Sequence, residues 1–147
     1  MNTDQLQRFS LTGQRALVTG GSKGIGASVA VELAKAGADV AIVGRYADGL
    51  ADTRVAFETK GRECLTIAAD LSTVDGPRAA GQAALEHFGT IDVLVNNAGV
   101  ALNDYLLDIS IDDWDRTQAI NVRAPMLLAQ TLAPAMIAQK QGKIVNI

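Results

Sequence analysis

Short apolar runs rich in β-branched residues alternate regularly with longer segments of helical pattern along this chain of 147 residues. The apolar runs are nearly continuous, which is typical of parallel strands covered on both faces. The segments predicted as strands are Arg15–Thr19, Asp39–Val43, Leu65–Ala68, Ile91–Val95 and Lys143–Ile147. The segments predicted as helices are Ile25–Ala36, Ala47–Lys60, Val74–Phe88 and Ile111–Gln139. This alternation predicts one α/β domain, a doubly wound parallel sheet with helices on both faces.

Local signals at the ends of these segments support the helix predictions. Two helix starts carry an acidic variant of the capping box, formed by Ser72 with Asp75 and by Ser110 with Asp113. Three predicted helices are followed by a glycine, which readily adopts the left-handed backbone needed there. These glycines are Gly37, Gly61 and Gly89.

Composition narrows the class of function. The net charge of −3 disfavours general nucleic-acid binding, and no apolar run approaches the roughly 18 residues of a membrane-spanning helix. The N-terminus lacks the apolar stretch of a signal peptide. Cys64 is the single cysteine and cannot form an internal disulfide, so the expected compartment is the cytoplasm. His87 has no Cys, Asp or His at ligand spacing, so no metal site is predicted.

A glycine-rich turn follows the first predicted strand directly, with the sequence Thr19-Gly20-Gly21-Ser22-Lys23-Gly24-Ile25-Gly26. Glycines at positions 20, 24 and 26 permit a tight turn and let the backbone approach a pyrophosphate. The helix that follows offers free N–H groups and a dipole that favour an anion. Taken alone, the motif also fits a plain glycine-rich turn without a ligand.

Four motifs, which occur in the family's order along the chain, resemble the classical branch of the short-chain dehydrogenase/reductase family. The glycine turn matches its T-G-x-x-x-G-I-G pattern, and Asn96-Asn97-Ala98-Gly99 matches N-N-A-G after the fourth strand. Asp70-Leu71 closes the third strand, and Asn121 falls in the fourth helix, where the family has its active-site Asn. The resemblance covers essentially all of residues 1–147. It implies a single dinucleotide-binding domain of Rossmann fold, incomplete relative to the family and truncated after the fifth strand.

The resemblance also implies how these motifs would hold a dinucleotide. The residues expected around the cofactor phosphates and the adenosine ribose are Gly20, Ser22, Lys23, Gly24, Ile25 and Gly26. Asp70 and Leu71 would hold the adenine. The residues expected to shape the sheet edge beneath the adenosine are Asn96, Asn97, Ala98 and Gly99. Without the resemblance, Asp70 could simply cap the next turn, and the asparagines could satisfy backbone groups of a turn.

The end of the second predicted strand, Gly44-Arg45, bears on the choice of cofactor. An acidic residue there would accept a hydrogen bond from the ribose 2′-hydroxyl and select NAD. Here the pair Arg45 and Lys23 offers two cations, which suit a 2′-phosphate. The sequence therefore favours NADP(H) over NAD(H), the alternative being a solvated arginine without function.

Asn121 is the catalytic residue predicted within this chain. Asparagine is a poor residue for a helix interior, and Pro125 lacks the N–H that would pair with the Asn121 carbonyl. The resemblance implies that this asparagine anchors a water in a proton relay. The alternative is a local kink that serves packing.

The other catalytic groups of the family are a Ser after the fifth strand and a Tyr-x-x-x-Lys pair. In this sequence Tyr46 is followed four residues later by Leu50, and Tyr105 by Ile109. We therefore expect an NADP(H)-dependent oxidoreductase of alcohol or carbonyl substrates whose cofactor half is inactive alone. The alternative is a non-catalytic truncated product that binds nucleotide or only self-associates. A flavodoxin-like FMN protein is disfavoured, since four motifs would then be accidental.

Two apolar features predict self-association. The fourth helix carries Met126, Leu127, Leu128 and Ala129 in succession, which covers its whole circumference with apolar side chains. The last strand has Lys143 as its one charged residue, and in the expected strand order 3-2-1-4-5-6-7 it becomes an edge. We expect a homo-oligomer through the fourth helix and no membrane partner.

Overall fold

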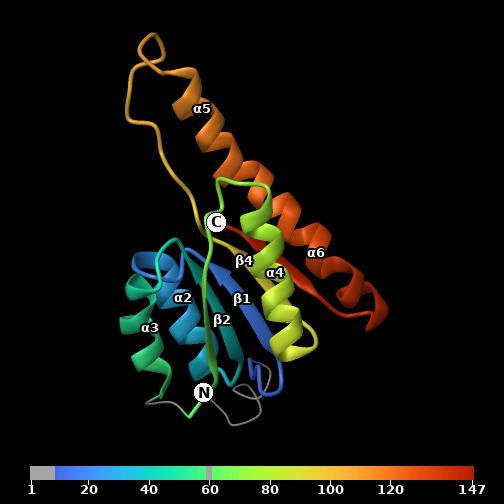
Figure 1. The fold of residues 1–147 in the computed structure, drawn as a ribbon. Coiled ribbons are helices and arrows are strands. Elements are labelled where there is room, and N and C mark those ends of the chain that lie inside the picture. Colours follow the sequence, from blue (N-terminus) through green and yellow to red (C-terminus); the bar gives the residue numbers. More distant parts are fainter. Residues whose placement is uncertain (1–8, 59–60) are drawn as a thin grey trace.

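A computed structural model describes residues 9–58 and 61–147 as one parallel sheet with helices on both faces (Figure 1). The strands are β1 (Arg15–Thr19), β2 (Asp39–Gly44), β3 (Cys64–Ala68), β4 (Val93–Asn96) and β5 (Lys143–Asn146). Their order is β3-β2-β1-β4-β5, and every neighbouring pair is parallel. The predicted doubly wound α/β fold is thus confirmed.

The two faces of the sheet are covered by two pairs of helices. A hydrophobic cluster joins α2 (Gly24–Lys35) and α3 (Asp48–Glu58) to the face of β1 that carries Ala16 and Val18. A second cluster joins α4 (Asp75–Phe88) and α6 (Ala124–Ala138) to the opposite face, which carries Leu17. Successive strand residues point to opposite faces, so an apolar run with both faces covered buries every side chain.

Strand order places the loops that concern function at one edge of the sheet. β1 lies between β2 and β4, with Val18 opposite Ile42 on one side and Val95 on the other. The chain therefore leaves β1 towards one side of the sheet and later returns on its other side. A crevice at the carboxyl ends of the strands is the expected consequence of such a reversal.

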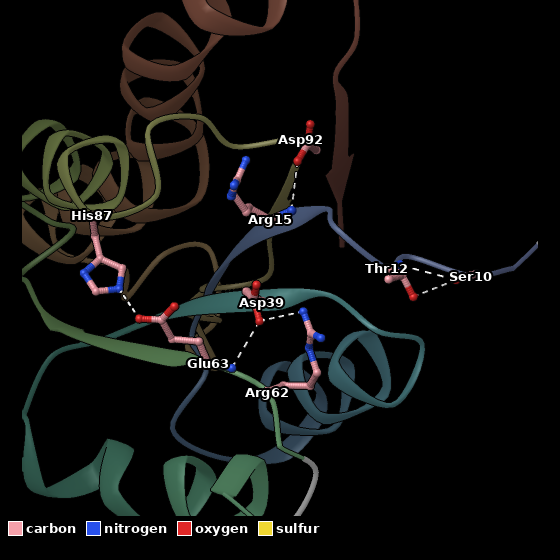
Figure 2. Close-up of polar contacts among 8 residues, drawn as sticks. All are labelled: Ser10, Thr12, Arg15, Asp39, Arg62, Glu63, His87 and Asp92. Carbon is pink, nitrogen blue, oxygen red and sulfur yellow. Dashed lines mark hydrogen bonds and ion pairs between the residues drawn. The ribbon is translucent and has the colours of Figure 1, made fainter.

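Polar contacts tie the amino ends of the strands together at the opposite edge (Figure 2). The N–H of Arg15 donates to Asp92 Oδ2 at 2.8 Å. Asp39 pairs with Arg62 at 2.8 Å between Oδ1 and Nη2. His87, expected on the surface, is exposed and lies 2.6 Å from Glu63 Oε1. These contacts connect β1, β2 and α4 with the segments before β3 and β4, at the end of the sheet remote from the crevice.

The expected helix ends are largely confirmed. Ser110 Oγ accepts a hydrogen bond from the N–H of Asp113 at 3.1 Å, as a capping box requires. Positive φ angles of 107°, 63° and 78° occur at Gly37, Gly61 and Gly89. The predicted end of the second helix, at Lys60, lies outside the described residues.

The capping prediction for Ser72 is wrong. Ser72 Oγ donates to Asp70 Oδ1 at 2.7 Å. Thr73 Oγ1 instead accepts from the N–H of Gly76, at 2.9 Å, just inside α4. The helix begins at Asp75 with Val74 as its N-cap residue, so Ser72 lies two residues before the cap position and Thr73 is the residue whose hydroxyl reaches the first turn.

The segment Ile111–Gln139, predicted as one helix, changes its hydrogen bonding midway. It consists of α5 (Ile111–Gln118), a π-helical turn η1 (Ala119–Arg123) and α6. The N–H of Ala124 donates to the carbonyl of Ala119, five residues earlier. Pro125 has no N–H to offer the α-helical ladder, which accounts for an interruption here. α5 and the loop before it project beyond the sheet (Figure 1, orange).

Candidate functional site: a cleft at the carboxyl edge of the sheet

A cleft of about 620 Å³ lies where the loops after β1, β2, β3 and β4 meet. The predicted cofactor residues that line it are Gly20, Ser22, Lys23, Arg45, Asp70, Leu71, Asn97, Ala98 and Gly99. Four others, Gly24, Ile25, Gly26 and Asn96, do not contribute to its lining. The structure therefore brings together residues of three of the four sequence motifs and Arg45, whereas Asn121 does not line the cleft.

The hydroxyl of Thr19, at the end of β1, joins this strand to the loop after β4. Thr19 is 2% exposed, and its Oγ1 donates to the carbonyl of Val95 at 3.4 Å. The same oxygen accepts from the N–H groups of Asn97 and Ala98, at 3.1 and 3.0 Å. The Asn97 side chain in turn donates a hydrogen bond from Nδ2 to the Thr19 carbonyl at 3.0 Å. Asn97 thus satisfies backbone groups, and together these bonds hold one wall of the cleft.

The glycines of the turn allow the backbone to fold tightly beneath the cleft. A Cβ on Gly26 would lie 2.2 Å from the carbonyl oxygen of Gly20, so any side chain there would displace the turn. Gly20 has a φ of +69°, and a Cβ on it would lie 2.8 Å from Asn97 Nδ2. Gly26 is therefore buried support for the turn rather than a lining residue.

The start of α2 presents backbone donors without a side-chain cap. Lys23 is the N-cap residue, with an extended backbone, and makes no capping hydrogen bond through its side chain. The N–H groups of the first helical turn, which includes Gly24 and Ile25, have no intrahelical acceptor. The Ile25 side chain is 64% exposed.

Asn96 is a buried residue of β4 rather than a wall of the cleft. It is 5% exposed, and its Nδ2 donates to Asn146 Oδ1 of β5 at 2.9 Å. The side chain therefore ties together the carboxyl ends of two neighbouring strands.

The end of β2 places a cation at the cleft, and a side chain at the residue before it would require Leu50 to shift. Gly44 is buried, and a Cβ there would lie 2.9 Å from Leu50 Cδ2. Arg45 is exposed and lines the cleft together with Lys23. Its guanidinium carbon lies 5.9 Å from the ring centroid of Tyr46, within the range of a cation–π contact.

Asp70 both shapes its own turn and faces the cleft. Its Oδ1 accepts from the N–H of Ser72 at 2.9 Å and from the Ser72 hydroxyl at 2.7 Å. The Ser72 hydroxyl is the main cause that lowers the pKa of Asp70, followed by the Ser72 N–H, while Arg45 and Arg116 contribute less. The turn-capping alternative is therefore correct for Oδ1, and the carboxyl group remains ionised at the edge of the cleft.

Asn121 lies in η1 and fastens the loop after β4. Its Oδ1 accepts from the N–H of Val100 at 2.9 Å, and its Nδ2 donates to the Val100 carbonyl at 2.8 Å. The side-chain amide thereby pairs with both the N–H and the carbonyl of Val100, as the backbone of a neighbouring strand would. Val100 lines the cleft, so Asn121 acts on the cleft through that loop.

Sequence reasoning missed three residues of this region. Ile120 is 5% exposed and lines the cleft from η1. Arg123 Nη2 donates to the Ser72 carbonyl at 2.5 Å. Thr19 appeared only as the first letter of a motif. A polar residue at the end of a buried strand could have indicated Thr19, whereas the other two depend on the π-helical turn.

Two kinds of site are not found within residues 9–58 and 61–147. No group of three His, Cys, Asp or Glu side chains there could hold a metal ion. No helix in the same ranges is long and apolar enough to cross a membrane.

Comparison with known proteins agrees with the motifs. The short chain dehydrogenase family model matches residues 14–147. Gluconate 5-dehydrogenase of Gluconobacter oxydans (strain 621H) is 43% identical over 140 residues, 95% of this chain and 54% of the relative.

Solved structures agree as well. A metagenomic short-chain oxidoreductase in complex with NADP superposes with a TM-score of 0.88 at 42% identity, covering 92% of this chain and 62% of the other. A short-chain type dehydrogenase/reductase from Mycobacterium marinum superposes with a TM-score of 0.89 at 36% identity, covering 99% of this chain and 59% of the other. The chain spans only somewhat more than half the length of these relatives. It belongs to the short-chain dehydrogenase family.

Proposed function

We propose that the cleft binds NADP(H) in preference to NAD(H). The observation that carries this proposal is that Arg45 and Lys23 line the same cleft as the glycine turn and Asp70. Two cations beside the end of β2 suit a phosphate on the adenosine ribose. A carboxylate at position 44, which would select NAD, would require Leu50 to move.

The remaining residues of the cleft fit the rest of a dinucleotide. The turn at Gly20 and the uncapped first turn of α2 offer N–H groups to a pyrophosphate. Asp70 carries its two Ser72 bonds on Oδ1, and Oδ2 accepts none among the described residues, so Oδ2 suits the exocyclic amine of adenine. Leu71, Asn97, Ala98 and Gly99 would complete the adenosine pocket. When bound, such a cofactor supplies or accepts a hydride.

For the whole protein we propose hydride transfer between NADP(H) and an alcohol or carbonyl substrate. The family of the chain supports this reaction class. Asn121, already fixed through Val100, would keep its backbone carbonyl for a water of a proton relay. Tyr-x-x-x-Lys does not occur in these 147 residues, which favours nucleotide binding without turnover when they act alone. Assembly through the α5–α6 segment and a cytoplasmic location are further parts of the proposal.

The cofactor proposal is tested by the affinities of NADPH and NADH at one fixed salt concentration. A charge-assisted hydrogen bond contributes about 1.5–3 kcal/mol, so NADPH should bind roughly ten- to a hundredfold more tightly. Arg45→Ala should remove most of this preference. Arg78→Ala, an exposed arginine of α4 outside the cleft lining, should preserve it. Equal affinities in the wild type, or a preference that survives in Arg45→Ala, would disprove the proposal.

A further inference from the structure

We propose that Arg123 is a positioning residue for the adenine side of the cleft, acting through the backbone of the turn that carries Asp70 and Leu71. The inference rests on the proposed function, because it concerns how this cleft holds a dinucleotide. Its basis is a contact between two segments remote in sequence. Arg123 Nη2 of η1 donates to the carbonyl oxygen of Ser72 at 2.5 Å, across 51 positions of the chain.

The turn itself is held mainly by bonds between its own residues. The Asp70 carboxylate accepts from the N–H and the hydroxyl of Ser72, and the Asp70 carbonyl accepts from Thr73 Oγ1 at 2.9 Å. A Cβ on Gly76 would collide with the same carbonyl, so the start of α4 is packed directly against the turn. These contacts lie within residues 70–76 and define the shape of the turn. They leave its placement over the cleft to contacts with other elements.

The turn continues directly from β3, where the N–H of Ala69 donates to the Gly44 carbonyl at 2.9 Å, and contacts with α4, α6 and η1 add to this placement. Leu71 is 9% exposed and packs into the core cluster formed with α4 and α6, which fixes the side-chain side of the turn. Arg123 donates to the carbonyl of the Ser72–Thr73 peptide, and a hydrogen bond from an ionised donor is roughly twice as strong as a neutral one. The guanidinium therefore holds the backbone of Ser72 from its carbonyl side, and the N–H and hydroxyl of the same residue hold the Asp70 carboxylate.

The same π-helical turn also fixes the opposite loop of the cleft. Asn121 pairs with both backbone groups of Val100, and Ile120 lines the cleft between the two loops. Residues two apart lie on nearly opposite sides of a helix. Asn121 and Arg123 can therefore reach separate loops from one turn. The turn η1 thus contacts two loops of this region, and Arg123 makes its contact with the Asp70 turn on the adenine side.

The experiment compares the binding of NADPH with that of its deamino analogue, which carries hypoxanthine in place of adenine and lacks the exocyclic amine. The dissociation constant of the analogue divided by that of NADPH reports on the contact between the base and the Asp70 turn. Loss of a charge-assisted bond predicts that Arg123→Met lowers this ratio about tenfold, mainly by weakening NADPH. Arg123→Lys, which keeps a charged donor, should restore part of the ratio.

Arg116→Met is the matched control, because Arg116 belongs to the neighbouring helix α5 and acts on the Asp70 carboxylate by charge alone. It should leave the ratio at the wild-type value. An unchanged ratio in Arg123→Met, an equal fall in Arg116→Met, or no recovery in Arg123→Lys would overturn the inference. If Arg123→Met fails to fold, Arg123→Lys against Arg116→Lys decides by the same ratio, which must fall in the former alone.

The wild-type measurements separate this inference from the function beneath it. A wild type that binds neither nucleotide overturns the proposed function and the inference with it. A wild type that binds both nucleotides equally overturns the inference alone, since the turn would then not read the base. A wild type that binds NADPH more tightly than the deamino analogue, together with a ratio that falls in Arg123→Met, supports the inference and the binding of a dinucleotide in this cleft.

Discussion

Thr19 illustrates how one side chain at the end of a buried strand can organise a binding edge. Its hydroxyl makes one bond as donor and two as acceptor, and all three join β1 to the end of β4 and the loop after it. Asn97 reinforces the junction through the Thr19 carbonyl. A buried polar group is favourable only when its hydrogen bonds are made. The exact fit of this junction is therefore a condition for both the sheet and the cleft.

Replacing Thr19 by valine should lower the free energy of unfolding by about 1–3 kcal/mol, because two N–H groups would lose their acceptor while the volume stays nearly the same. Urea denaturation measures this change. Thr19→Ser, which keeps the hydroxyl but loses a methyl group, is the control and should cost less. A valine variant that is at least as stable as the serine variant would contradict the role assigned to the hydroxyl.

At the scale of elements, the π-helical turn η1 decides what the long α5–α6 segment can do. The apolar pattern of Ile111–Gln139 predicted continuous helix, and the axis does continue (Figure 1). The change to a bond between Ala124 and Ala119 places polar and apolar side chains around the cleft that a uniform helical period would not place there. π-helical turns inside α-helices occur frequently at functional sites.

Asn121→Ala should release the loop after β4 from η1. Loss of two hydrogen bonds to Val100 at a partly exposed position should lower the free energy of unfolding by about 1–2 kcal/mol. Hydrogen exchange of the Val100 amide should accelerate, since that N–H loses its acceptor. Asn103→Ala, in the same loop and exposed, should leave this exchange unchanged. An equally protected Val100 amide in Asn121→Ala would show that the loop is held by other means.

At the scale of the whole molecule, exposed apolar side chains gather on the projecting α5–α6 segment and on β5. Leu127 and Leu128 are buried against the sheet, but Met126 is 46% and Val122 59% exposed. β5 ends the sheet, and its Val145 is 45% exposed. The apolar side chains of the helix thus form two sets: one is buried against the sheet, and the other, called the outward half, faces away from it.

We expect the 147-residue chain to self-associate through the outward half. Light scattering at micromolar concentration should give a mass above the 15.4 kDa of one chain. Met126→Glu should shift the distribution towards the monomer, because a charge would be buried in the contact. Val55→Glu, at an apolar position of α3 that is 58% exposed, should have no such effect. A monodisperse wild-type monomer would refute this expectation.

The sequence alone determined the strands, the helix ends marked by Ser110 and Gly89, and the glycine turn after β1. These features arise from local preferences: side-chain period, capping and the backbone freedom of glycine. The resemblance carried by the motifs pointed to residues such as Gly20, Asp70 and Asn97, which the structure brings to one cleft, and their contacts with a cofactor stay a prediction. Ser72 was misassigned as a cap because the helix begins later than predicted, with Val74 as its N-cap residue.

Only the tertiary structure decided which distant groups meet. Thr19 and Asn97 are 78 positions apart and meet because β1 and β4 are neighbours in the sheet. Arg123 reaches Ser72 because η1 interrupts a helix that the sequence pattern predicted as regular. Sheet order and a change of helical period depend on the packing of the whole core. No local window of sequence contains that information, which is why the contacts of η1 with Val100 and Ser72 became visible only in the structure.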